Sequence, residues 1–154
     1  MHYADLSPCT YFPFEAARKL IAVGWLDPLV EYNRGVLEDE FVRKLVELLY
    51  DPWQPALAMG SHECGFCRLS GGPSTFRLGR SGSEAVLGTS NVFVPGDGFL
   101  FVAPSLILHY MDAHEYSPPA EFQQAVITCP PMRSMEYLKA ILKNGPKEMM
   151  PKRS

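Results

Sequence analysis

Residues 91–103 have the sequence NVFVPGDGFLFVA, and this stretch decides the fold class. Its two apolar segments, Val92–Val94 and Phe99–Val102, are rich in the β-branched and aromatic residues that favour strands. The segment between them contains the pair Asp97-Gly98, which accepts the positive φ angles of a tight turn. The sequence therefore predicts a β-hairpin here.

Upstream of the hairpin, the sequence predicts one further strand and one helix. Leu20–Leu26 is a short, nearly continuous apolar run that suits a buried strand, although Glu15–Lys19 just before it favours helix on propensity. Apolar residues in Leu37–Leu49 recur at helical spacing, and Pro52 follows them. Arg68–Asn91 is rich in glycine, serine and threonine, which indicates a loop or a weak hairpin.

Downstream of the hairpin, three helices are predicted. The first has Ser105 as its N-cap and runs to about Glu115, and the second opens at Pro118-Pro119 and ends at Pro130-Pro131. The third covers Ser134–Asn144. In it, four residues at helical spacing are expected to face the core: Met135, Leu138, Ile141 and Leu142.

These elements predict an α+β fold, because strands dominate the first two-thirds of the chain and helices the last third. We expect a small antiparallel sheet with the hairpin, packed by one central helix and three C-terminal helices. Residues 1–146 are expected to form a single domain, and residues 147–154 a flexible tail. An apolar content of 47% in 154 residues is enough for one sizeable core.

Charge and the first residues limit the cellular setting. The net charge of −3 gives no global basic field, so no nucleic-acid partner is expected. The first eight residues, MHYADLSP, have neither the basic nor the apolar region of a secretion signal, and no apolar run is long enough for a membrane span. We therefore expect a cytoplasmic protein without membrane attachment, and leave open a protein partner and self-association.

The cysteines and histidines point to a metal site. In a reducing compartment disulfides are not expected, and Cys64 and Cys67 form a C-x-x-C turn that directs two sulfurs to one point, as in a zinc knuckle. His109 and His114 supply two further ligands at H-x4-H spacing. On an ideal helix, residues five apart differ by about 140° around the axis, so both can reach one ion only if the helix loosens near His114.

Other residues compete for these roles. His62, beside the C-x-x-C, is the alternate ligand for either histidine. Cys9 and Cys129 have no histidine neighbours in the sequence and are expected to be core thiols. His2 is expected to be an ordinary terminal residue.

Three functions are compatible with this zinc hypothesis. The first is a binding or adaptor module with a structural zinc ion, and it is favoured because the four ligands form a closed set and no catalytic motif is present. The second is a zinc-dependent hydrolase that uses Glu63, Asp112 or Glu115 as a general base. The third is a thiol redox protein, but Arg68–Pro73 breaks the helix that such a motif normally opens.

Several segments together resemble a family of small bacterial proteins of unknown function. They carry the pattern YxDLxP, then VGWLD, then HxCxxC, then HYxxxH, and they begin at Tyr3, Val23, His62 and His109. The likeness covers most of residues 3–131. It implies a bacterial cytoplasmic protein, is compatible with a shared metal site, and supplies no activity.

Overall fold

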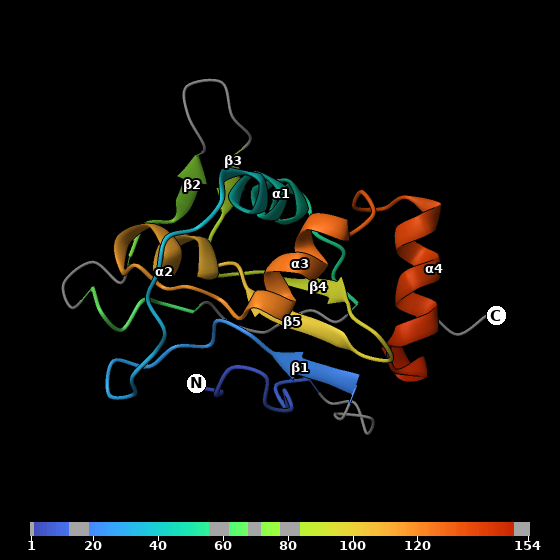
Figure 1. Cartoon of the computed structure of the whole chain (residues 1–154), viewed down its shortest axis with the longest axis horizontal. Coiled ribbons are helices and arrows are strands. Elements are labelled where there is room, and N and C mark those ends of the chain that lie inside the picture. Colours follow the sequence, from blue (N-terminus) through green and yellow to red (C-terminus); the bar gives the residue numbers. More distant parts are fainter. Residues whose placement is uncertain (1, 13–18, 56–61, 68–71, 78–83, 150–154) are drawn as a thin grey trace.

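A computed structural model describes residues 2–12, 19–55, 62–67, 72–77 and 84–149 of the chain (Figure 1). In these ranges, short strands paired in two small sheets, together with four α-helices, confirm the predicted α+β class. Most of the helix-prone segment that precedes the first strand, residues 15–18, lies outside the described ranges.

The larger sheet contains the predicted hairpin and one strand from far away in the sequence. β4 (Asn91–Pro95) and β5 (Leu100–Pro104) pair antiparallel, and Gly98 in their turn has φ 86°. β1 (Leu20–Ala22) lies on the other side of β5 and pairs with it in parallel, with Leu20 opposite Leu100. The expected antiparallel sheet is thus a mixed sheet of order β1-β5-β4.

The glycine- and serine-rich region forms the second sheet. β2 (Thr75–Arg77) and β3 (Glu84–Val86) pair antiparallel, with Phe76 opposite Ala85. This is the weak hairpin that the sequence allowed between Arg68 and Asn91. Residues 68–71 and 78–83 of that region lie outside the described part of the chain.

The helices cover the sheets and bring distant segments into one core. Their bounds are α1 (Asp39–Tyr50), α2 (Ile107–Ala113), α3 (Ala120–Thr128) and α4 (Met135–Asn144). α1 packs against α3 and β3, whereas α4 packs against β4 and stands at one edge of the molecule (Figure 1). Of the helices in the described ranges, none is both long enough and apolar enough to cross a membrane.

The buried face of α4 differs from the prediction. Tyr137, Ile141 and Asn144 face the protein, while Met135, Leu138 and Leu142 are 63%, 41% and 53% exposed. The prediction was therefore wrong for three of its four residues. The tertiary contact that decides the orientation is the Tyr137 phenol, which donates a hydrogen bond of 2.7 Å to the Phe93 carbonyl of β4.

Ser105 does not cap α2, so this prediction was also wrong. Leu106 occupies the N-cap position, and no side chain caps the helix there. The buried Ser105 hydroxyl instead accepts a hydrogen bond of 2.8 Å from the backbone N–H of Gly88. Ser105 thereby ties the start of α2 to the end of the second sheet.

The segment after α4 is partly described. Residues Lys147–Met149 form a short 3-10 helix, and the Met149 side chain is buried. The remainder of the expected tail, residues 150–154, lies outside the described ranges.

Candidate metal centre

The C-x-x-C segment forms a tight turn. The Cys67 backbone N–H donates a hydrogen bond of 3.2 Å to the Cys64 carbonyl, and Cys64 is buried. Burial raises the pKa of the Cys64 thiol, and the backbone N–H groups of Phe66 and Cys67 act in the opposite direction. No helix begins within residues 62–67, in contrast to the helix that opens at a thioredoxin-type motif.

The two histidines lie on α2 and at its end. His109 is buried within the helix, and His114 is the C-cap residue, with φ −119° and ψ 11°. The Tyr110 carbonyl accepts hydrogen bonds from the backbone N–H groups of both His114 and Tyr116. The helix therefore ends where the spacing of the histidines required it to loosen, and both rings can turn to the same side.

The side chains of Cys64, Cys67, His109 and His114 converge on one point. One ligand atom from each lies within 4.8 Å of all the others. Cys64 Sγ is 3.4 Å from His114 Nε2, and Cys67 Sγ is 3.3 Å from His109 Nε2 and 3.7 Å from His114 Nε2. In a tetrahedral zinc site with ordinary bond lengths, sulfur and nitrogen ligands are about 3.6 Å apart. The four residues thus lie close enough together to hold one metal ion.

The electrostatics of the two imidazoles suit metal binding. Burial lowers the pKa of His109, with a further decrease from the charge of His114. Burial also lowers the pKa of His114, assisted by the positive charge of Arg34. Both rings are therefore held neutral near pH 7, the form in which an imidazole nitrogen donates its lone pair to a metal.

The structure does not bring His62 into this cluster. Its ring packs against the rings of Tyr11 and Trp25, with both centroid distances 5.4 Å. Within the described residues, its buried Nε2 has no hydrogen-bond partner. Cys9 and Cys129 are also buried and lie outside the cluster.

None of the candidate general bases belongs to the cluster either. Glu115 is exposed and forms an ion pair of 3.5 Å with Arg34. Glu63 lines a cavity of 120 Å³ together with His62 and Tyr110, and Asp112 lines a separate cavity of 220 Å³. In the described part of the chain, no carboxylate lies among the four converging ligand atoms.

Three residues that the sequence analysis did not select, Phe66, Tyr32 and Gly72, shape the surroundings of the ligands. The Phe66 ring lies 4.8 Å from the His114 ring at an interplanar angle of 33°, and the Tyr32 hydroxyl donates a hydrogen bond of 2.8 Å to the His114 carbonyl. Gly72 is so close that a Cβ there would be 3.0 Å from the Cys64 Cβ and 3.4 Å from His109 Nε2. Phe66 is the one of these that lies inside the C-x-x-C, and only for it did the sequence offer a local signal.

Comparison with known proteins identifies a family without an assigned activity. Residues 1–127 match the model of a family described as a domain of unknown function, DUF7919. No curated protein and no solved structure matches the chain. The matched range contains all four converging side chains and ends within α3.

Proposed function

Because the chain belongs to the family of the domain of unknown function DUF7919, which carries no assigned activity, we propose its function from the metal centre: one structural zinc ion held by Cys64, Cys67, His109 and His114. The observation that carries this proposal is the set of sulfur–nitrogen distances, 3.3 to 3.7 Å, which matches tetrahedral zinc. Four protein ligands fill the coordination shell, and two thiolates make the ion a weak Lewis acid. Both properties are typical of structural sites.

The ion would order the loop of residues 27–34, which lies against the C-x-x-C turn. Tyr32 reaches the metal centre through the His114 carbonyl and through its edge contact with Phe66, at a centroid distance of 5.6 Å. A Cβ at Gly65 would be only 2.9 Å from Cγ of Pro28, so the turn and the loop are in direct contact. Loss of the metal would therefore change the conformation of the loop.

This loop presents apolar side chains to solvent, which supports a binding or adaptor role. Leu29 is 94% exposed and Val30 is 45% exposed. Both line a shallow cavity of 540 Å³ whose wall includes Phe66. Exposed apolar side chains on an ordered loop are a common basis for protein recognition. We propose that the zinc holds this loop in the conformation that a protein partner recognises.

The hydrolase alternative rests on Glu63, which lines the cavity next to the C-x-x-C turn. It requires an open coordination position with a bound water, in place of one of the four protein ligands. The redox alternative requires two thiols that cycle with a disulfide and hold no metal. The metal content of the purified protein and the ligands around the ion distinguish the three functions.

The sequence resemblance supports a bacterial and cytoplasmic setting, which we propose together with the zinc site. The net charge of −3 favours a protein over nucleic acid as the partner. Residues 1–146 are proposed to act as one unit, since α4 packs on the strand β4 of the matched region.

Metal analysis of protein purified without chelator tests the zinc. We expect about one zinc per chain, and X-ray absorption should show two sulfur and two nitrogen ligands without a coordinated water. Less than about a tenth of an equivalent would contradict the proposal. A shell containing an exchangeable water would favour the hydrolase, and a disulfide between Cys64 and Cys67 would favour redox chemistry.

Limited proteolysis tests the link between the ion and the loop. Chymotrypsin should leave the chain intact at Tyr32 while zinc is bound and should cut there after a chelator removes the metal. Tyr50, at the end of α1, is the control site, because its cleavage should not depend on zinc. Equal protection of Tyr32 with and without zinc would contradict the ordering role.

A further inference from the structure

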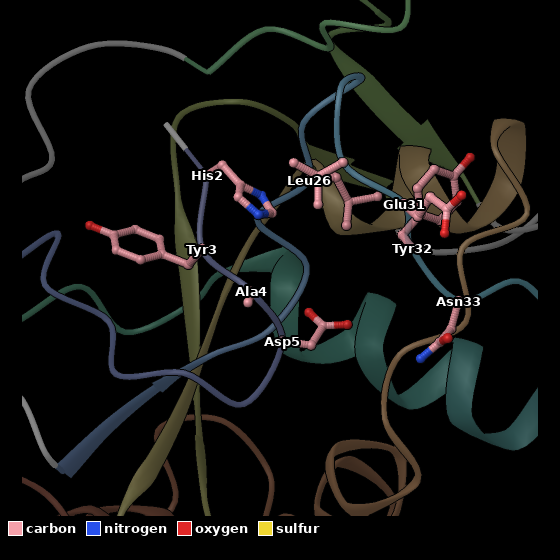
Figure 2. A pocket seen from close by; sticks show the side chains of 9 residues that line it. His2, Tyr3, Ala4, Asp5, Leu26, Glu31, Tyr32 and Asn33 are labelled. Carbon is pink, nitrogen blue, oxygen red and sulfur yellow. The ribbon is translucent and has the colours of Figure 1, made fainter.

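We propose that a cavity between loop 27–34 and the N-terminal residues 2–5 binds an organic cation, an alkylammonium or alkylguanidinium group. The cavity has a volume of 290 Å³ and lies between the N-terminal segment and residues 26–33 (Figure 2). Its polar lining comes chiefly from His2, Asp5, Glu31 and Asn33, and Leu26 and Val30 add an apolar wall. None of the four proposed metal ligands lines this cavity.

The carboxylate of Asp5 has a fixed orientation in this cavity. Oδ1 accepts a hydrogen bond of 3.0 Å from the Gly24 N–H, and Oδ2 accepts one of 2.7 Å from the Tyr116 hydroxyl. Figure 2 shows the carboxylate directed into the space between Ala4 and Asn33. Each oxygen keeps a further lone pair for a ligand, and no rearrangement is needed to present it.

Among the residues that the structure describes, no lysine or arginine is paired with either of the two carboxylates. Neither lysine nor arginine lines the cavity, and within the described residues no ion pair includes Asp5 or Glu31. The nearby Arg34 is occupied with Glu115 and lies 4.9 Å from the centre of the Tyr32 ring. A partly buried negative charge without a counter-ion favours a cationic ligand and disfavours an anionic one.

The remaining lining groups also call for hydrogen-bond donors on the ligand. His2 Nδ1 is 2.6 Å from the Trp25 carbonyl, so in the neutral ring this nitrogen carries the proton and Nε2 is left as an acceptor. Leu26 and Val30 can contact a short aliphatic chain. The volume is at the lower end of the range for small-molecule sites. Together these features fit a chain of a few carbons that ends in an ammonium or guanidinium group.

Agmatine tests the proposal, because it has an ammonium at one end and a guanidinium at the other. Isothermal titration of the full-length, zinc-loaded protein should show saturable binding at a single site. 4-Guanidinobutyrate, of equal length but with a carboxylate in place of the ammonium, should bind more weakly. Blocked peptides that contain a single arginine or lysine distinguish two sources of the cation. If the natural ligand is a protein side chain, these peptides should bind as well as agmatine; if it is a free amine, agmatine should bind and the peptides should not.

Matched variants locate the binding. Glu31→Gln removes one charge at an exposed residue and should weaken agmatine binding roughly tenfold or more. Glu47→Gln, at an exposed position of α1, is the control and should bind like the wild type. Asp5→Asn should weaken binding further, although it also alters the contacts to Gly24 and Tyr116. Absence of binding by every cation at millimolar concentration, or equal affinity of the Glu31 and Glu47 variants, would overturn the proposal.

Discussion

The Tyr116 hydroxyl donates a hydrogen bond of 2.7 Å to Oδ2 of Asp5, although 111 residues separate the two in the sequence. Tyr116 is fully buried, and burial together with the negative charge of Asp5 raises the pKa of its phenol well above the usual range. The bond ties the N-terminal segment to the residue that lies two positions after His114. It therefore connects the cavity beside Asp5 with the end of α2, the helix that carries His109.

Tyr116→Phe should destabilise the protein by about 1–3 kcal/mol, because the charged acceptor on Asp5 loses a buried donor. Urea unfolding measures this loss. Tyr50→Phe is the control, since Tyr50 is exposed and its variant should unfold like the wild type. If both variants have the same midpoint, the hydrogen bond does not contribute to stability.

Cys64→Ala should lower the melting temperature much more than Cys9→Ala. Loss of a thiolate ligand releases the metal and its contribution to folding, whereas the buried Cys9 contributes packing alone. Thermal melts should be repeated with a chelator, which ought to remove most of the difference between the two variants. Small and equal shifts without chelator would show that the C-x-x-C acts only as buried sulfur.

His114→Ala should lose the zinc, and His62→Ala should keep it. His114 Nε2 lies 3.4 Å from Cys64 Sγ, while the His62 ring packs against Tyr11 and Trp25. Removal of a residue that only supports the ligands typically costs about 10- to 100-fold in metal affinity, and removal of a ligand costs more. Competitive chelator titration compares the two variants. Release of the metal from the His62 variant alone would place His62 in the coordination shell.

Ile141→Ala should cost about 2–5 kcal/mol, and Leu142→Ala less than about 0.5 kcal/mol. Ile141 is 1% exposed on the buried face of α4, whereas Leu142 is more than half exposed. The two residues are neighbours with side chains of equal size, so each is a control for the other. Urea unfolding at one pH decides the comparison, and a larger loss for Leu142→Ala would contradict the orientation of α4.

Stability should fall when the pH rises above about 10, the ordinary pKa of tyrosine. Burial raises the pKa of Tyr137 in the folded state, with a further increase from the charge of Cys129. Above pH 10 the unfolded chain therefore releases the phenol proton while the folded chain retains it, and the proton difference favours unfolding. At neutral pH, Tyr137→Phe should have a lower free energy of unfolding than the wild type. Above pH 10 the free energy of unfolding of the variant should fall less steeply than that of the wild type, by up to about 1.4 kcal/mol per pH unit. Urea unfolding as a function of pH measures both slopes, and parallel curves would refute this assignment.

The sequence predicted those elements whose signal is local. The hairpin of β4 and β5 needed only two short runs of strand formers and Asp97-Gly98, and α1 needed only its apolar periodicity. The orientation of α4 could not be predicted in the same way. Met135, Leu138 and Leu142 form one apolar stripe, and Tyr137 with Ile141 forms another, so periodicity gives two solutions. The contact between Tyr137 and the Phe93 carbonyl selects one of them.

The metal centre shows the same division between local and tertiary causes. The sequence by itself predicted that a C-x-x-C turn directs two sulfurs to one point, and that His109 and His114 can reach one ion only if the helix loosens near His114. Only the tertiary structure decided that α2 lies against this turn, that His62 packs on Tyr11 and Trp25, and that Tyr32 supports His114. The spacing of residues along the chain determines the relative directions of their side chains within one turn or helix. The distance between two segments that lie more than 40 residues apart is set by the packing of the whole core.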